Sequence, residues 1–360
     1  MDKLTHKYLL AEKKIKEVIS QLEIDDKLPG ERVFAKNFGF SYMTIRKAVE
    51  NLVAEGVLYK IPKKGAYVAG RKATRNITKN IGYFLDTNIK DGLTSPYYSL
   101  VFDALEKEAT KHGFALMYCS DFDESLTKME KIDGAIISCF PRIENIVQHV
   151  NKLVPVVCID NRSADKSIPS VTIDNFNAVV ESTGYLCSLG HKRIGFITGL
   201  DDSDVGVNRL EGYKSALKSH GINEDADLIY KGDYSFETGL KAADYFLSLD
   251  KRPTAIVCAN DIMAIGVIKK SLKRGFNVPE DLSVTGFDDI NIASQLTPAL
   301  TTVTAPVREI AKHCVQMLSS LINHVNLDNR HISLPGKLML RDTCATNPDS
   351  MTAARKLKIN

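Results

Sequence analysis

The sequence of 360 residues contains no run of 18 consecutive apolar residues, and its first segment, MDKLTHKYLLAEKK, has no apolar stretch followed by a small-residue cleavage site. We therefore expect no membrane span and no secretory signal, and we predict a cytoplasmic protein. The seven cysteines are an odd number, and no two of them form a C-x-x-C pair. This spacing excludes a disulfide framework and argues against a zinc site, so no metal is expected.

Signature motifs of common enzyme classes are also missing. No G-x-G-x-x-G follows a strand pattern, and the chain has no P-loop, no H-E-x-x-H and no G-x-S-x-G. We expect a protein that is not an enzyme and uses no cofactor. The many carboxylates leave a carbohydrate-active enzyme with a glycosidase pair open as an alternative, which turnover of nitrophenyl glycosides would reveal.

Charge is distributed unevenly along the chain. Residues 1–79 hold 17 Lys and Arg against 9 Asp and Glu, a net charge of +8, whereas the remaining residues hold 30 against 35, a net charge of −5. A basic first segment on an acidic body favours contact of the first segment with a polyanion. Basic solvated faces are common, however, so the charge indicates a polyanion partner only together with a binding motif.

The first 69 residues show the pattern of a winged helix-turn-helix. An apolar stripe at residues 8–22 predicts one helix, and a second is expected from Glu31 to Phe38, ended by Gly39. Ser41 is a good N-cap for a third helix, in which Ile45 faces the core. Strands at 57–61 and 66–69 flank the basic tip Pro62–Gly65 and predict a hairpin.

The third helix has the geometry of a recognition helix, because the DNA major groove admits one helix whose N-terminal residues reach the base edges. The candidate DNA-binding residues on this helix and on the hairpin tip are Ser41, Tyr42, Met43, Thr44, Arg46, Lys47, Lys63, Lys64 and Gly65. The segment LPGERVFAKNFGFSYMTIRKAVENLVAEGVLYKIPKKGAYVA resembles the DNA-binding domain of GntR-type repressors. The resemblance implies that Arg32, Thr44 and Arg46 contact operator DNA. Tyr42 stands where that family often has arginine, and Lys63-Lys64-Gly65-Ala66 replaces its usual G-x-G-T.

Residues 70–80 have no apolar period and predict a linker, and the pattern from Ile81 onward changes to buried strands alternating with amphipathic helices. This alternation is typical of an α/β fold with parallel sheets. The expected strands are at 81–86, 114–119, 134–138, 155–160, 193–198, 254–259 and 282–287. Seven strands are too many for one small sheet and indicate two lobes, at 81–345, followed by a flexible tail at 346–360.

Ligands of such folds bind beyond the carboxyl ends of the strands, and several polar side chains follow strands here. Asp160, Asp174, Asn260 and Asp288 come directly after strand patterns. Carboxylates, an amide and an arginine can hydrogen-bond neighbouring hydroxyls, and tyrosine rings can stack on a sugar ring. Asp174 with Asn175 is equally a helix N-cap, and Asp288 can cap a turn.

The segments SPYYSLVFDALEKEATKHGF, SVTIDN, LGHKRIGFITG, NRLEGYKSAL and PTAIVCANDIMAIGVIKKSLKRGFNVPEDLSVTGFDD resemble the effector domain of LacI-type repressors, whose fold is that of periplasmic sugar-binding proteins. The resemblance covers residues 80–343. It implies an effector cleft lined by Tyr97, Tyr98, Asp160, Asp174, Arg209, Tyr234, Asn260 and Asp288. A GntR-like head on a LacI-like body is similar to arabinose repressors.

These observations predict a ligand-responsive transcription factor. We expect a homodimer that represses sugar-utilisation genes from double-stranded operator DNA and is released by a mono- or small oligosaccharide, arabinose being one candidate. A purine or another non-sugar effector is the alternative.

Overall fold

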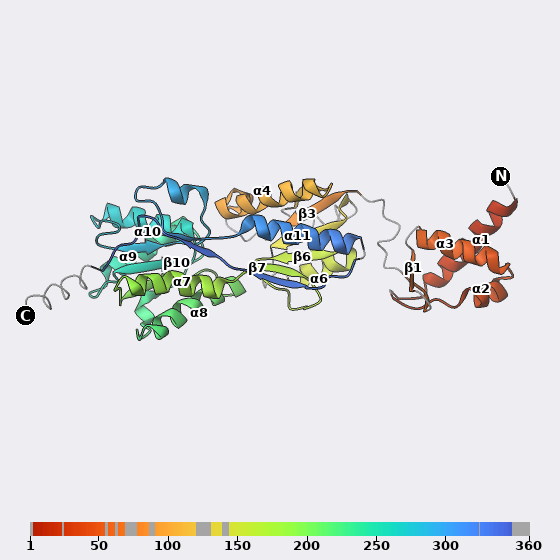
Figure 1. The fold of residues 1–360 in the computed structure, drawn as a ribbon, viewed down its shortest axis with the longest axis horizontal. Coiled ribbons are helices and arrows are strands. Elements are labelled where there is room, and N and C mark those ends of the chain that lie inside the picture. Colours follow the sequence, from red (N-terminus) through yellow and green to blue (C-terminus); the bar gives the residue numbers. More distant parts are fainter. Residues whose placement is uncertain are drawn as a thin grey trace, which may run out of the picture. The chain divides into compact units, whose positions relative to one another are not determined.

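The computed structural model describes residues 3–23, 25–54, 57–61, 64–68, 78–85, 91–119, 131–138, 144–323 and 325–347. The chain divides into two compact units, Met1–Thr78 and Lys79–Asn360, which we call the head and the body (Figure 1). No helix in the described ranges is long and apolar enough to cross a membrane.

The head is a winged helix-turn-helix, as predicted. It contains α1 (Lys3–Ile19), α2 (Glu31–Phe38), α3 (Tyr42–Ala54), β1 (Leu58–Ile61) and β2 (Gly65–Val68). Gly39 adopts a left-handed φ of 70° and donates its N–H to Ala35 O, which ends α2, while the Ser41 hydroxyl accepts the Thr44 N–H and starts α3. β1 and β2 pair antiparallel in a hairpin, and the three helices and the hairpin enclose an apolar core of their own.

The first lobe of the body is built on a six-stranded parallel sheet. In sheet order its strands are β13 (His331–Leu334), β7 (Ser170–Ile173), β6 (Val156–Ile159), β5 (Gly134–Ser138), β3 (Asn80–Phe84) and β4 (Ala115–Cys119). Helices α4 (Pro96–Lys111) and α11 (Val307–Ile322) bury apolar residues on one face, and α6 (Glu144–Leu153) buries Val147 and Val150 on the other. Every residue of β5 and β6 is buried, as expected of central parallel strands.

The second lobe has a four-stranded parallel sheet in the order β11 (Ser283–Thr285), β10 (Ala255–Cys258), β8 (Ile194–Ile197) and β9 (Ile229–Tyr230). Helices α7 (Asn175–Ser188) and α8 (Asp204–Ser219) pack together, as do α9 (Phe236–Ser248) and α10 (Asp261–Lys273), and the sheet lies between the two pairs (Figure 1). Both helix pairs approach closely at glycine, because a Cβ at Gly212 would overlap the Phe176 carbonyl and one at Gly239 the Met263 carbonyl.

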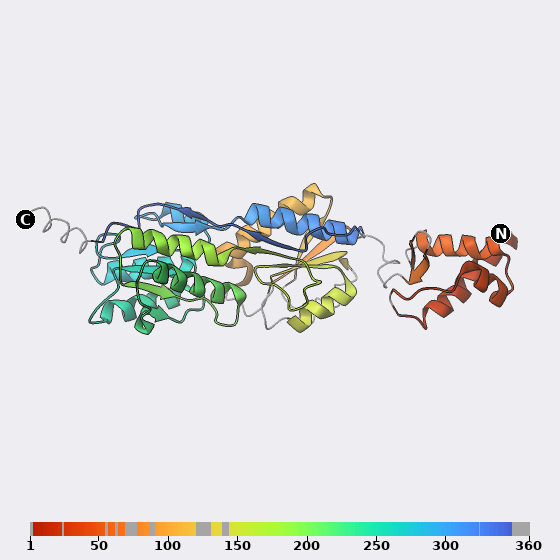
Figure 2. The ribbon, with the colours of Figure 1, turned by 60° about the horizontal axis from the view of Figure 1, so that its bottom comes forward.

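Three stretches of chain connect the lobes: the one after β7, the one after β12 (Thr302–Thr304), and the one between β13 and β14 (Lys337–Met339). β12 and β14 pair antiparallel beside the crossings, and the blue segments of Figure 2 run from one lobe to the other there. Three chain crossings of this kind allow the lobes to rotate against each other while the sheet of each lobe stays intact.

Both sheets have a topological switch point. The chain enters the first sheet at β3, which lies between β4 and β5, and the second at β8, which lies between β9 and β10. Loops that leave the carboxyl ends on opposite sides of such a point open a crevice, which is where α/β sheets bind ligands. The two crevices belong to the same unit of the chain, and the cavity described below is lined by residues that follow these strand ends.

The structure also differs from the sequence predictions. β9, β12, β13 and β14 are strands of two to four residues that were not expected, because their stability comes from distant partners, as in the pairing of β13 with β7. The predicted tail at 346–360 is wrong at its start, since the N–H of Asn347 donates to Leu189 O and its amide to Gly190 O. At the other end, Lys79 N donates to Asp133 Oδ2, so this residue of the predicted linker is held by the body. Residues 70–77 of that linker lie outside the described residues.

Candidate functional site

The predicted recognition helix presents polar and exposed residues on one side. Ile45 is fully buried, whereas Met43 is 64% and Tyr42 41% exposed, and Arg46 and Lys47 are exposed as well. Thr44 is bonded to Ser41 through both its N–H and its hydroxyl, which fixes the first turn of the helix. The Arg46 Nε donates to Glu50 Oε1 at 3.1 Å, so the arginine extends along the outer face of α3.

A groove of about 730 Å³ lies beside this helix, between the start of α2 and the hairpin. Its lining includes Arg32, Tyr42, Lys60, Lys64 and Gly65. Lys60 also forms an ion pair with Glu31 at 2.9 Å, which ties the hairpin to α2. The groove thus brings Arg32 and the predicted hairpin residues Lys64 and Gly65 together with Tyr42, the first residue of α3. Lys63, the remaining predicted residue, lies outside the described residues.

The cavity of the body, of about 350 Å³, is lined by residues of both lobes. Seven of the eight predicted cleft residues lie in its wall: Tyr97, Tyr98, Asp160, Arg209, Tyr234, Asn260 and Asp288. They come from places as far apart in sequence as the start of α4, the end of β6 and the end of β11. The prediction that these side chains converge is therefore matched by the geometry, with Asp174 as the exception.

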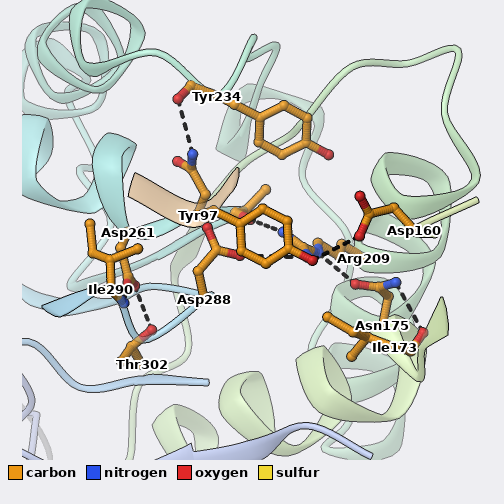
Figure 3. A network of polar contacts seen from close by, with 12 residues as sticks. Tyr97, Asp160, Ile173, Asn175, Arg209, Tyr234, Asp261, Asp288, Ile290 and Thr302 are labelled. Carbon is orange, nitrogen blue, oxygen red and sulfur yellow. Dashed lines mark hydrogen bonds and ion pairs between the residues drawn. The ribbon is translucent and has the colours of Figure 1, made fainter. Parts of the chain in front are cut away.

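Arg209 is fixed in the cavity wall by hydrogen bonds, a stacked ring and a nearby carboxylate. It is only 4% exposed, its Nε donates to Asn175 Oδ1 at 2.8 Å, and its Nη1 donates to the Ala259 carbonyl (Figure 3). The guanidinium stacks on the Phe287 ring at 3.6 Å from the ring centre and lies 3.9 Å from Asp288 Oδ1. Two of its five N–H donors are thus used for positioning, and its Nη2 faces Asp288.

Two carboxyl groups face the cavity from opposite lobes. The Tyr97 hydroxyl donates to Asp160 Oδ1 at 2.7 Å on the first lobe, and Asp288 lies beside Arg209 on the second. Burial raises the pKa of both carboxyl groups, and the positive charge of Arg209 works against this rise. The Asp160 Oδ2 and the Tyr234 hydroxyl are buried, and no described residue meets the distance and angle of a hydrogen bond to either atom. The Ser138 and Ser203 side chains are near enough to act against the rise in the pKa of Asp160 and Tyr234. Buried polar atoms are normally paired, so the Asp160 Oδ2 and the Tyr234 hydroxyl are an exception within the cavity wall.

The backbone of the cavity is strained at several points. Asp91, Asp160, Tyr234 and Asp288 all have positive φ, of 70°, 69°, 65° and 112°, and all four line the cavity. Non-glycine residues rarely adopt this conformation, and such outliers gather at functional sites. The Tyr234 ring also lies over Gly199, where a Cβ would overlap it. The strain places these side chains at positions that relaxed loops would not reach.

Asp174 does not line the cavity. Its carboxylate accepts the N–H of Asn177 at 3.1 Å and the Asn177 side chain at 2.7 Å, so it is the N-cap of α7. Its neighbour Asn175 is the residue that matters to the site, through its bond to Arg209. Asn260 has two roles, because it lines the cavity and also caps α10 through Met263 N, while its Nδ2 donates to the Tyr234 carbonyl.

The sequence analysis missed several residues of the wall: Asp91, Ser95, Pro96, Leu200, Val205, Asp233, Ser235 and Ile262. Most of them lie within four residues of a predicted cleft residue, so closeness in sequence to a predicted residue could have identified them. It also missed Asn161, whose side-chain oxygen accepts the Val205 N–H at 3.2 Å and so joins the end of β6 to the start of α8 across the two lobes. No group of three His, Cys, Asp or Glu side chains in the described ranges is arranged to hold a metal ion.

Comparison with known proteins agrees with both parts of the chain. Residues 7–68 match the model of bacterial regulatory proteins of the gntR family, and residues 183–344 match that of the periplasmic binding protein-like domain. The HTH-type transcriptional repressor CytR of Escherichia coli is 32% identical over 275 residues, covering 74% of this chain and 79% of that protein. The chain belongs to the LacI family of transcription regulators.

Two further proteins support this membership. The HTH-type transcriptional repressor PurR of Vibrio atlanticus is 28% identical over 335 residues, covering 87% of this chain and 97% of PurR. The structure of a sugar-binding transcriptional regulator of the LacI family from Escherichia coli, in complex with phosphate, is similar with a TM-score of 0.62. It is 28% identical and covers 76% of this chain and all of the other. The protein is a DNA-binding transcriptional regulator with a small-molecule effector domain, and it is not an enzyme.

Proposed function

We propose that this LacI-family regulator is a cytoplasmic homodimer that represses sugar-utilisation genes and leaves its operator when a mono- or small oligosaccharide enters the cavity. Arabinose is one candidate ligand. The observation that carries the effector role is the pair of buried, unbonded polar atoms, Asp160 Oδ2 and Tyr234 Oη, that face the cavity beside Arg209. Hydroxyls of a sugar can satisfy both, since each hydroxyl offers a donor and two acceptor sites.

The proposed ligand contacts combine this polar set with aromatic rings. Tyr97 and Tyr98 lie edge to face at 5.1 Å, and Tyr234 enters the wall from the other lobe. Their rings can cover the C–H face of a sugar while Asp160, Arg209, Asn260 and Asp288 bond its hydroxyls. That a relative 28% identical is described as sugar-binding favours the same class. Tyrosine rings also stack well on a flat base, and for that reason a purine or nucleoside effector is the second candidate.

In the proposed DNA complex, α3 lies in the major groove. Tyr42, Met43, Thr44, Arg46 and Lys47 face the base edges or the adjoining phosphates, and Ser41 holds the first turn of the helix. Arg32, Lys63, Lys64 and Gly65 contact the backbone beside the groove between α2 and the hairpin. Two heads on a symmetric dimer would match an operator of two half-sites, because operator symmetry mirrors protein symmetry.

Release would follow from closure of the two lobes on the ligand. The lobes are joined by three crossings, so rotation about these crossings changes their relative orientation without breaking either sheet. The ligand shifts operator affinity only by its different affinity for the open and closed forms, a coupling of typically about 1–3 kcal/mol.

A gel shift on the DNA upstream of the protein's own gene tests the proposal, with pentoses, hexoses, small oligosaccharides and nucleosides added in turn. We expect retardation of the DNA by the protein alone and release by a member of the sugar set. The variant Asp288→Asn keeps the size of the side chain and should hold DNA but respond weakly to that sugar. Asp103→Asn, an exposed carboxylate of α4 that pairs with Lys107, is the matched control and should respond normally. Failure of the protein to retard duplex DNA at low salt, or an unchanged response of Asp288→Asn, would contradict the proposal.

A further inference from the structure

The described wall of the cavity carries far more negative than positive charge. Its fifteen residues include four carboxylates, Asp91, Asp160, Asp233 and Asp288, and one basic residue, Arg209. With all five side chains ionised the formal charge of this wall is −3, and the raised pKa of the buried Asp160 and Asp288 makes the charge at neutral pH less negative than this value. A charged wall of this sign repels an anionic ligand, and the repulsion is strong in a partly buried site where water screens it poorly.

The single arginine does not offset this charge for an incoming anion. The guanidinium of Arg209 is already bonded to Asn175 and Ala259 and lies 3.9 Å from Asp288, which neutralises much of its field. A phosphate group is normally held by several donors with net positive charge around it. Here such a group would bring a second anion next to Asp160 and Asp288, at a place where both carboxyl groups are already buried.

The rest of the wall favours a neutral ring. Tyr97, Tyr98 and Tyr234 supply aromatic surface, and Pro96, Leu200, Val205 and Ile262 supply aliphatic surface. The unbonded Asp160 Oδ2 accepts hydrogen bonds from hydroxyl or amine donors, which a sugar or a nucleoside carries and a fully ionised phosphate or carboxylate group lacks.

We infer that the carboxylates of the cavity act as a charge filter, so that the effector is an uncharged hydroxylated ring without phosphate or carboxylate groups, either a free sugar or a nucleoside. The inference rests on the proposed effector role of the cavity. It adds that phosphorylated sugars, sugar acids and nucleotides are excluded from this cavity.

Asp91 provides the cleanest variant for testing the filter. It is exposed at the start of the 3₁₀ turn Gly92–Thr94, and its carboxylate forms no hydrogen bond with another described residue. Its φ of 70° is one that asparagine also adopts readily, so Asp91→Asn removes one charge and keeps the backbone. Asp103→Asn changes the net charge of the chain equally and lies outside the cavity wall, which makes it the matched control.

Calorimetric titration of the full chain tests the filter with pairs of probes: arabinose and arabinose 5-phosphate, glucose and glucose 6-phosphate, cellobiose and cellobionic acid, and nucleosides with their monophosphates. We expect a neutral member to bind and its anionic partner to bind at least about 100-fold more weakly, since the two differ by a charge placed among buried like charges. The sugar and nucleoside pairs identify which ring is accepted. In Asp91→Asn the ratio of the two dissociation constants should fall by about 3- to 10-fold, consistent with loss of one nearby charge, and in Asp103→Asn it should not change.

An anionic probe that binds as tightly as its neutral partner would overturn the filter and leave the effector role standing. Equal changes of the ratio in Asp91→Asn and Asp103→Asn would also overturn it, because the effect would then come from the net charge of the chain. Failure of every probe in both arms to bind would contradict the effector role itself, and the filter with it.

Discussion

At the scale of single residues, the cavity depends on side chains that are held in place before a ligand arrives. Arg209 is bonded to Asn175 and stacked on Phe287, and Asp160 receives the Tyr97 hydroxyl (Figure 3). A site whose groups are already oriented loses little conformational entropy on binding. The same bonds mean that removing Arg209 would leave a buried carboxyl beside an unpaired amide, which destabilises the fold as well as the site.

Arg46 is the residue of the head for which the sharpest prediction can be made. Within the described part of the head its ion-pair partner is Glu50, on the same helix, and its side chain is half exposed, so Arg46→Ala should leave the fold of the head intact. We expect operator affinity to fall by about 1–3 kcal/mol, the usual loss for an arginine at a base edge. Fluorescence anisotropy with labelled operator DNA measures this. Lys107→Ala, which removes a positive charge from an exposed ion pair of α4, should bind DNA normally, and equal behaviour of the two variants would show that α3 is misassigned.

At the scale of elements, four helices of the second lobe begin close to the cavity, and each is capped by a side chain. Asp174 caps α7, Ser203 caps α8, Ser235 caps α9 and Asn260 caps α10. Caps orient the first turn of a helix, and here the first turns carry Asn175, Val205 and Ile262 toward the site. A residue just after a strand, such as Asp174, can therefore orient the helix that carries a residue of the site without lining the cavity itself.

The cap of α7 allows this distinction to be tested. Asp174→Ala removes the bond to Asn177 and should lower the free energy of unfolding by about 1 kcal/mol, whereas Asp174→Asn should retain most of it because asparagine is an equally good cap. Urea denaturation measures the difference. Neither variant should change the dissociation constant of the effector, since Asp174 lies outside the cavity. A large loss of effector affinity in Asp174→Asn would restore this residue to the list of ligand contacts.

The bond from Val205 N to Asn161 Oδ1 joins α8 to the first lobe, and α8 also carries Arg209 one turn later. Asn161→Ala should weaken the closed form by one hydrogen bond, about 0.5–1.5 kcal/mol, and so lower effector affinity by about 2- to 10-fold. Calorimetry measures this loss. Asn323→Ala, which removes only a bond to Ser319 at the end of α11, should bind the effector normally. Unchanged affinity in Asn161→Ala would show that closure does not use this bond.

At the scale of the whole molecule, the head and the body each have an apolar core, and the basic charge is concentrated before residue 80. The structure thus separates DNA contact from ligand contact. Coupling between the two requires that the body fixes the spacing of two heads, which is the role we assign to the proposed dimer.

Removal of the body tests this role. A fragment of residues 1–78 keeps the core of the head, and we expect it to bind operator DNA at least about 100-fold more weakly than the full chain at equal salt, because it loses the linked second head. Anisotropy measures both affinities, and sedimentation reports the oligomeric state. In both proteins affinity should fall steeply with salt as phosphate contacts release counterions. A fragment that binds as tightly as the full chain would contradict the dimer argument.

Local signals in the sequence were enough for the head and for the existence of the body. The cap at Ser41, the glycine at Gly39 and the buried runs of β5 and β6 act over a few residues, so periodicity and capping rules predicted them. The short strands β9, β12 and β14 could not be found in this way, since each exists only because a distant strand supplies its hydrogen bonds. The positions just after strands pointed to Asp160, Asn260 and Asp288, and the resemblance to LacI-type repressors added Tyr97, Tyr98, Arg209 and Tyr234, so that seven of the eight predicted residues line the cavity.

Only the tertiary structure decided which of those residues line the cavity. Asp174 and Asp288 follow strands in the same way, yet one turns back to cap its own helix and the other, with a φ of 112°, points into the cavity. Their side chains differ in direction because the crossing between the lobes and the strained turn after β11 set the backbone, and neither is encoded in the residues on either side. The charge of the cavity arises in the same way, from four aspartates that are far apart in the chain and meet only when both lobes have folded.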